Sequence, residues 1–276
     1  MKTLLTIAFL SIAILGLSQT KWDKSREMGL TVGTAYYIGD INPTKHFGTR
    51  MNLAAGLMYR NNISKKIGMK GSFMYGRVEA YDMDAKDPWQ VNRNLSFRND
   101  VLEVAVTGEI NYFDYQIGDR ANPISPYLFL GLAYYSMRPQ AEYLGNWYEL
   151  QPLGTEGQGT TEGALKYKTS GVSMPFGAGL KVNLFSILAF NVEWGMRRTW
   201  TDYFDDVSGA YVSPAVLEEE NGQLSAILAD RSTAQEGAND QNAGLQRGDP
   251  GRKDWYNFTT FTLSIRLGKS PTSCWK

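Results

Sequence analysis

The sequence contains only one cysteine, Cys274, and only one histidine, His46. A single cysteine excludes an intramolecular disulfide and any metal site built from several cysteines. A hydrolytic triad needs a histidine base beside a serine, and the Gly-x-Ser-x-Gly element of many hydrolases is absent. The composition therefore gives no support to a catalytic centre of either kind.

Net charge and long apolar runs are also lacking. The 28 basic residues balance the 28 acidic residues, so charge predicts neither a nucleic-acid partner nor docking on anionic lipid. Beyond the N-terminal segment no run of 18 apolar residues occurs, which argues against a transmembrane helix. No P-loop or Gly-x-Gly-x-x-Gly motif is present. We predict no cofactor, no small-molecule substrate and no enzymatic activity.

The N-terminus has the pattern of a secretory signal. Lys2 precedes an apolar run, and Gly16 and Ser18 then place small residues at the −3 and −1 positions of a cleavage site. The apolar run is shorter than the roughly 20 residues of a membrane-spanning helix. We predict a signal peptide over residues 1–18, cleaved between Ser18 and Gln19, with a buried N-terminal helix as the alternative. No cysteine stands at the cut, so we predict no lipoprotein anchor.

Eight segments have the features of β-strands. In residues 172–184, apolar side chains such as Val172 and Phe176 alternate with Ser173 and Lys181 on the other face. Clear alternation marks the segments 100–113, 172–184, 188–196 and 255–267, and weaker alternation marks 28–38, 52–59, 67–76 and 127–135. These lengths lie near the roughly 9 to 11 residues with which a tilted strand crosses a bilayer. The pattern predicts an all-β fold.

Short and long joins between these segments alternate along the chain. The short joins are 60–66, 114–126 and 185–187, and the long joins are 39–51, 77–99, 136–171 and 197–254. Outer-membrane barrels have short periplasmic turns and longer outside loops. We therefore predict an eight-stranded antiparallel transmembrane β-barrel in the outer membrane, with apolar faces against lipid. A soluble β-sandwich or lipocalin-like barrel is the alternative, but neither has a reason to sort its loops in this way.

The polar faces of the strands would then line the interior. An eight-stranded barrel is just wide enough for side chains to fill it. The charged residues assigned to the lumen, with Arg197 at its rim, are Lys70, Glu103, Glu109, Lys181, Glu193, Arg197 and Arg266. Because an unpaired buried charge costs several kcal/mol, we expect these residues to pair as an internal salt-bridge plug. A small-solute channel is the alternative.

The outside loops contain the remaining candidates for chemistry. His46 lies in the first loop, where a solvated histidine is the simplest interpretation and a rim-site hydrolase of lipid or protein is the alternative. Asp202, Asp205 and Asp206 are weak candidates for a Ca²⁺ site, although turn chemistry also favours aspartate. In the last loop, residues 214–231 could hold a short helix, and 232–251 read as a mobile polar segment.

Four strings in these loops and the first strand suggest a family. They are EMGLTVGTAYYIGDIN (27–42), TDYFDDVSGAY (201–211), LADRS (228–232) and RGDPGRKDWY (247–256). Together they resemble the PorG-like outer-membrane proteins of Bacteroidetes, a family named for a component of the type IX secretion system. The residues that carry the resemblance are Tyr37, Gly39, Asp40, Asn42, Asp205, Asp206, Arg247, Gly248 and Asp249.

The resemblance implies a small barrel in the secretion and gliding machinery. In that family the barrel is an outer-membrane anchor associated with the periplasmic ring of the PorK lipoprotein and PorN, and it is not the translocation channel. The short joins at 61–66 and 114–125 are then candidate ring contacts. The resemblance implies no catalytic residues. One departure is the tail at 268–276, which continues beyond the expected end of the last strand.

Overall fold

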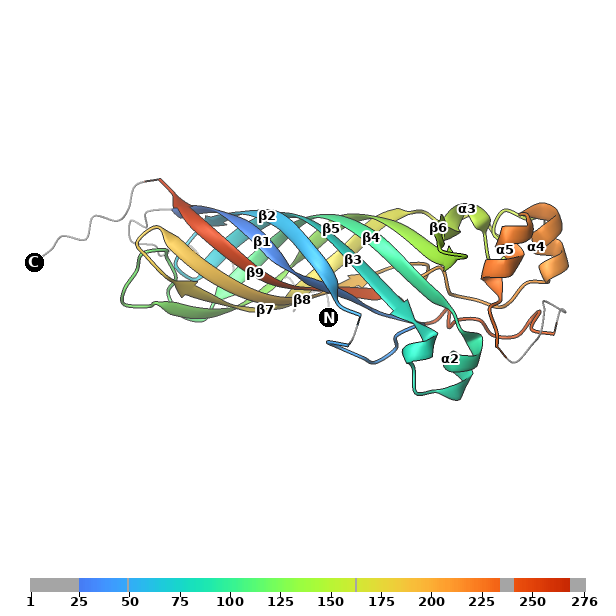
Figure 1. The fold of residues 1–276 in the computed structure, drawn as a ribbon. Helices are drawn as coiled ribbons and strands as arrows, with labels where there is room; N and C mark the ends of the chain where they lie inside the picture. The colour runs from blue at the N-terminus through green and yellow to red at the C-terminus, as the bar shows by residue number, and fades with distance from the viewer. Residues whose placement is uncertain (1–24, 49, 162, 234–240, 269–276) are drawn as a thin grey trace, which may run out of the picture.

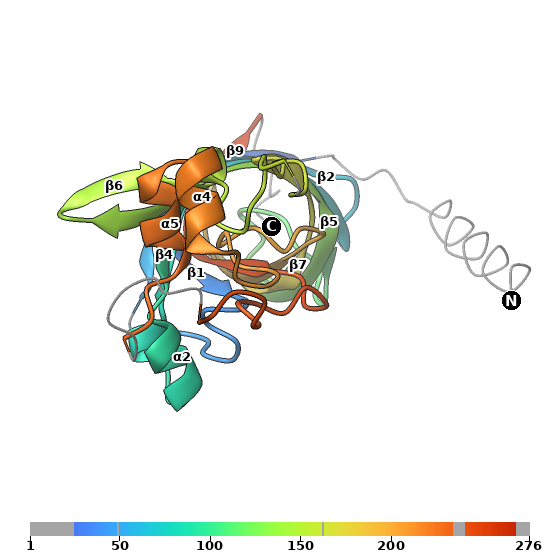
Figure 2. The same cartoon turned by 90° about the vertical axis from the view of Figure 1, so that its right-hand side faces the viewer.

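The chain forms a closed antiparallel barrel, seen from the side in Figure 1 and from its long-loop end in Figure 2. The computed structural model describes residues 25–48, 50–161, 163–233 and 241–268. The predicted signal peptide, the Ser18–Gln19 cleavage site, Cys274 and the tail after Gly268 lie outside these residues.

Within the described residues, eight long strands and one short strand make up the sheet. They are β1 (Ser25–Ile38), β2 (Asn52–Asn62), β3 (Ile67–Tyr81), β4 (Ser96–Asn111), β5 (Ile124–Tyr143), β6 (Asn146–Glu149), β7 (Ser170–Asn183), β8 (Leu188–Thr199) and β9 (Trp255–Leu267). The long strands pair in chain order, and β9 closes the ring against β1 from Trp255↔Ile38 to Leu267↔Arg26. The short strand β6 pairs only with β5 and extends it as a hairpin. The predicted eight-stranded barrel is confirmed.

The two faces of the barrel wall are opposite to those of a soluble protein. In β4, the carboxylate of Glu103 is fully buried, whereas the neighbouring Val104 is 53% exposed. The same alternation continues along β4 to Glu109, which is buried, and Ile110, which is exposed. A strand presents successive side chains to opposite faces, so every second position points into the lumen. The wall is therefore apolar outside and polar inside.

The helices gather at the end of the barrel where the long loops lie (Figure 1). They are η1 (Asp82–Asp84), α2 (Pro88–Arg93), α3 (Leu150–Leu153), α4 (Pro214–Glu220) and α5 (Gln223–Ala229). None of these described helices is long and apolar enough to cross a membrane.

The bounds of the long loops differ from those expected. β3 continues to Tyr81 and β4 already begins at Ser96, so the expected loop at 77–99 is shorter and contains η1 and α2. β5 likewise continues to Tyr143, inside the expected loop at 136–171. These strands are longer than expected because their ends still pair with a neighbour: β3 pairs with β4 up to Tyr81, and β5 pairs with β4 up to Gln140 and with β6 up to Tyr143.

The last loop is also more ordered than expected. The helix expected at 214–231 is divided into α4 and α5, with a break at Asn221 and Gly222. In the segment read as mobile, Ala210 and Gln246 form an isolated β-bridge, and Nδ2 of Asn242 donates a 2.6 Å hydrogen bond to Asp230. Residues 241–251 therefore make defined contacts with the rest of the last loop, while 234–240 lie outside the described residues.

Candidate functional site

Arg60 is the centre of the charged network in the lumen. Its Nη1 lies 2.7 Å from Glu27 Oε2, and its Nε lies 2.8 Å from Glu109 Oε2. All three side chains are buried. Sequence reasoning missed both Arg60, which it placed in a join, and Glu27, which it placed before the first strand. One more residue of alternation at each of these strand ends would have assigned both to the lumen face.

The residues expected in the lumen extend this network in two directions. Lys181 Nζ lies 2.6 Å from Glu109 Oε2, and Lys70 contacts both Glu109 and Glu193. The hydroxyl of Tyr127 donates a 2.7 Å hydrogen bond to Glu193. Each carboxylate therefore has at least one cation beside it, as buried charges require.

A separate ion pair lies nearer the long-loop end. Nε of Arg197 lies 3.1 Å from Glu103 Oε2, which also accepts a 2.7 Å hydrogen bond from the Tyr256 hydroxyl. Arg266 stands directly opposite Glu27 in the β1–β9 register, and its Nη1 donates to the carbonyl of Ile117 in a short join. Ile117 and its neighbour Tyr115 are buried at that end of the barrel.

Little space is left between these side chains. A cavity of about 20 Å³ is lined by residues of the network, including Arg60, Lys70 and Glu193. That volume is enough for about one water molecule. The interior at this level is occupied by the side chains of paired charges.

The long loops fold back over the barrel mouth. We call the described parts of four loops, 39–51, 82–95, 150–169 and 200–254, the loop cap. At its base the ring of Phe204 stacks on Tyr256, with centroids 5.1 Å apart and planes 8° apart. Tyr37 and Tyr135 contact the same ring at 6.2 and 5.8 Å. Phe204 is fully buried, so the last loop closes the mouth with an aromatic side chain.

Arg247 joins separate segments of the loop cap although it is fully buried among them. Its Nη1 donates to the carbonyl of Asp206 at 2.6 Å and to Glu156 Oε1 at 2.8 Å. Its own carbonyl accepts a 2.6 Å hydrogen bond from Arg93, which is also paired with Asp82 at 2.7 Å. Arg247, the arginine of the Arg-Gly-Asp string, thus connects separate loops through buried hydrogen bonds.

Two carboxyl groups of the loop cap meet at one hydroxyl. The Tyr37 hydroxyl lies 2.6 Å from Asp205 Oδ2 and 2.7 Å from Asp254 Oδ1. Burial raises the pKa of both aspartates well above the ordinary value, and charge repulsion raises the pKa of Asp205 further, first from Asp254 and then from Asp40. The pKa of Asp40 itself is raised to about 6, mainly by burial.

The weak Ca²⁺ candidates do not converge. Asp205 faces Tyr37, whereas Asp206 accepts a 2.6 Å hydrogen bond from Tyr167 and Asp202 accepts one of 2.7 Å from Ser208. Burial raises the pKa of Asp206 to about 6. Across the ranges that the structure describes, no group of three or more His, Cys, Asp or Glu side chains could hold a metal ion. The structure thus gives this candidate no geometry for a metal.

The other residues of the four strings shape tight contacts between loops. A Cβ on Gly39 would lie 1.8 Å from the Tyr37 hydroxyl, and one on Gly248 would lie 2.5 Å from Asp40 Oδ2. The same Asp40 oxygen accepts a 2.9 Å hydrogen bond from the amide of Asp249. Strings far apart in sequence therefore meet in one packed region.

Asn42 and His46 order the first loop. Nδ2 of Asn42 donates to the carbonyls of Tyr37, at 2.6 Å, and Lys45, at 2.9 Å. The exposed His46 ring lies edge-on to Tyr36, and its Nδ1 is 3.1 Å from the Tyr36 hydroxyl. The described partner of the histidine is thus a tyrosine, and no triad geometry is formed by this contact.

Solved structures of outer-membrane proteins resemble this barrel. Neisserial surface protein A is 7% identical, with a TM-score of 0.42 and coverage of 89% of this chain and 100% of that chain. A major outer membrane protein from Thermus thermophilus is 8% identical, with a TM-score of 0.41 and coverage of 89% and 100%. The attachment invasion locus protein Ail of Yersinia pestis, in complex with the heparin analogue sucrose octasulfate, is 11% identical, with a TM-score of 0.38 and coverage of 88% and 97%.

These likenesses concern the type of fold alone. No curated protein sequence matches this chain. The family model described as "Domain of unknown function (DUF6089)" matches residues 4–213, which is more than half of the sequence, and the chain belongs to this family.

Proposed function

We propose that this protein is a non-enzymatic outer-membrane barrel that anchors and helps to assemble a type IX protein secretion and gliding machinery. The observation that carries the proposal is a wall with an apolar outer face around a lumen filled by paired charges. Val104, exposed on that face, and Glu103, buried behind it, are neighbours in one strand. Apolar side chains toward lipid and polar side chains inside are the arrangement of outer-membrane barrels.

A filled lumen favours an anchoring role over conduction. Arg60 with Glu27 and Glu109, and Arg197 with Glu103, occupy the interior with ion pairs. Opening a path would require breaking buried pairs, each at a cost of about 3 to 5 kcal/mol when one partner is left unpaired. The protein therefore contributes a fixed structure to the membrane.

The secretion role rests on the resemblance to PorG-like proteins. The strings that carry it supply the packed residues of the loop cap, among them Gly39, Arg247 and Asp205. We expect such residues to stabilise the packed structure of the outside loops. Their burial in structural contacts also supports the proposal that the protein is not an enzyme.

The short joins are the proposed contact with a periplasmic ring of the PorK and PorN type. Only part of each join is available, because Asn62, Tyr115 and Ile117 are buried. Ile63 and Arg120 are exposed at this end of the barrel. These side chains are the ones that we expect a partner to reach.

Photo-crosslinking in living cells tests the proposal. A photoreactive residue in place of Ile63 or Arg120 should capture the ring proteins, whereas the same residue in place of Leu165, which is 93% exposed in a long loop, should not. Captured proteins are identified by mass spectrometry. Capture of ring proteins only from Leu165, or from none of these positions, would contradict the proposed contact.

A further inference from the structure

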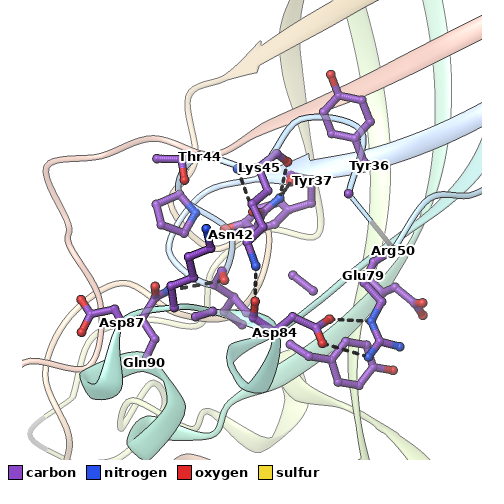
Figure 3. A pocket seen from close by; sticks show the side chains of 17 residues that line it. Tyr36, Tyr37, Asn42, Thr44, Lys45, Arg50, Glu79, Asp84, Asp87 and Gln90 are labelled. Carbon is purple, nitrogen blue, oxygen red and sulfur yellow. Dashed lines mark hydrogen bonds and ion pairs between the residues drawn. The ribbon is translucent and has the colours of Figure 1, made fainter.

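A cleft of about 410 Å³ lies beside the barrel mouth, between the first loop and the far end of β3 (Figure 3). One wall is formed by the first loop, including Ile41 and Asn42, and the other by Ala80, Tyr81 and Asp84. The cleft is at the opposite end of the barrel from the short joins. None of the contacts proposed above uses it.

The backbone of β3 lacks a strand partner along this cleft. The register with β2 ends at Ala54↔Gly76, whereas the register with β4 continues to Tyr81↔Ser96. Residues 77–81 therefore belong to a sheet on the β4 side alone. Among the described residues, no strand pairs with Glu79 or Tyr81 on the cleft side.

The backbone groups of β3 that face away from β4 point toward the cleft, and the described residues provide no strand partner for them. The amide of Asp82 donates a 2.9 Å hydrogen bond to the carbonyl of Leu95, which lies on the β4 side. Backbone groups of successive strand residues point in alternating directions. The N–H and C=O of Tyr81 and Glu79 therefore point away from β4, toward the first loop.

We propose that this cleft binds an extended segment of a partner polypeptide, which adds a strand to the free edge of β3. An exposed strand edge is a template for pairing with another chain, and the main-chain hydrogen bonds supply affinity in this mode of recognition. The five residues from 77 to 81 span about 17 Å at roughly 3.4 Å per residue. That length accommodates about five residues of an added strand.

The lining defines the chemistry of this segment. Pro43, Tyr81 and Ala85, which are partly exposed, contribute apolar surface. The charged residues of the lining are balanced, with Lys45, Arg50 and Lys86 opposite Glu79, Asp84 and Asp87. Arg50 is already paired with Asp84 at 2.7 Å and lies over the Tyr81 ring at 4.1 Å. The segment that fits is therefore largely uncharged, with an apolar side chain at every second position.

Selection from a random nine-residue peptide library tests the proposal on the full chain in lipid nanodiscs. Peptides that bind should alternate apolar and polar residues, should lack proline, and should slow hydrogen exchange at the amides of Glu79 and Tyr81. A library that yields no binders above the level of empty nanodiscs would overturn the proposal.

A pair of variants at one position separates backbone from side-chain recognition. Glu79→Pro removes an N–H that faces the cleft and is not part of the β4 ladder, a position at which an edge strand tolerates proline. We expect binding to weaken about tenfold or more, since the hydrogen bond and the geometry of its neighbours are lost. Glu79→Ala keeps the N–H and should bind within about twofold of the wild type.

Modified peptides test the same main-chain hydrogen bonds without any change to the protein. Two forms of a selected peptide are compared, one N-methylated at the odd-numbered amides and one at the even-numbered amides. The form methylated at the amides that face β3 should not bind, whereas the form methylated at the amides that face away should bind as well as the unmodified peptide. Equal binding of both methylated forms, or equal binding to Glu79→Pro and Glu79→Ala, would show that the β3 edge is not used.

Discussion

The Tyr37 hydroxyl lies 2.6 Å from Oδ2 of Asp205, and the same oxygen lies 2.7 Å from Oδ1 of Asp254. A hydroxyl donates one proton, so two contacts this short need a second proton on one of the carboxyl groups. Burial and mutual repulsion raise the pKa of both aspartates, which favours that proton. We therefore expect the two aspartates of the loop cap to share one proton with the Tyr37 hydroxyl.

Stability of the loop cap should fall as the pH rises. A carboxyl whose pKa is raised in the folded state binds its proton more tightly there, so its stabilisation is present at low pH and is lost as the pH passes the folded pKa. Asp40 and Asp206 each have a pKa of about 6 in place of the ordinary 3.8, so their contribution to stability should be lost between about pH 3.8 and 6. The pKa values of Asp205 and Asp254 are raised further, so the loss of stability should continue above pH 6. Hydrogen exchange of the Phe204 and Val207 amides, corrected for intrinsic rates, should show protection that decreases by up to about tenfold per pH unit for each proton released.

Asp205→Asn is the matched control for this prediction. Its Oδ1 can still accept from the amide of Val207, as Asp205 does at 3.0 Å, while its Nδ2 donates to Tyr37. The variant imitates the protonated carboxyl, so protection of the cap amides should depend less on pH and should exceed that of the wild type at pH 8. A pH profile identical to that of the wild type would contradict the shared proton.

A methyl group at Gly39 should loosen the loop cap without opening the barrel. In Gly39→Ala the new Cβ would lie 1.8 Å from the Tyr37 hydroxyl and 2.1 Å from Asp254 Oδ1, so one of the loops must move. Overpacking of this kind costs about 1 to 3 kcal/mol. The measurement is limited proteolysis of the 200–254 loop, which should be faster in the variant. Gly48→Ala, whose Cβ would meet only Lys45 Cβ at 3.9 Å, should be cleaved at the wild-type rate.

Removing one partner of the central lumen network should destabilise the barrel strongly. Arg60→Met leaves Glu27 and Glu109 buried without their guanidinium, at an expected cost of about 3 to 5 kcal/mol in the free energy of unfolding. Urea titration in lipid vesicles measures this loss.

An exposed ion pair in the same barrel provides the comparison. Arg77 and Asp100 lie 2.7 Å apart, with 37% and 25% of their side chains exposed, so Arg77→Met should cost less than about 1 kcal/mol. Equal losses in the two variants would mean that the lumen network is not the stabilising feature.

The strand faces could be predicted from the sequence because their alternation is periodic and local. Glu103, Lys181 and Glu193 were assigned to the inner face from a few neighbours each, and all three are buried. Glu27 and Arg60 were missed because the strands that carry them alternate weakly near their ends, where small and polar residues dominate both faces.

The loop cap has no such periodic signal. Tyr37 and Asp254 touch across 217 positions of sequence, and Asn99 reaches Phe204 across 105. Such contacts depend on where the closed barrel brings the loops together. The four strings predicted that particular loop residues are important, but neither the burial of these residues nor their partners could be derived from spacing.

Orientation of the barrel can be tested by labelling single cysteines in a background that carries Cys274→Ser. An impermeant maleimide should label Leu165→Cys in intact cells, because the long loops face outward. Arg120→Cys, in a short join, should be labelled only after the outer membrane is permeabilised. The reverse pattern would invert the assignment of the two ends.

The central claim is that the apolar outer wall is in contact with lipid. The most direct measurement is extraction of total membranes with alkaline carbonate, followed by detection of the chain in the pellet and in the supernatant. The account predicts that the chain stays in the membrane pellet and is released only by detergent. A chain recovered in the supernatant without detergent would contradict it.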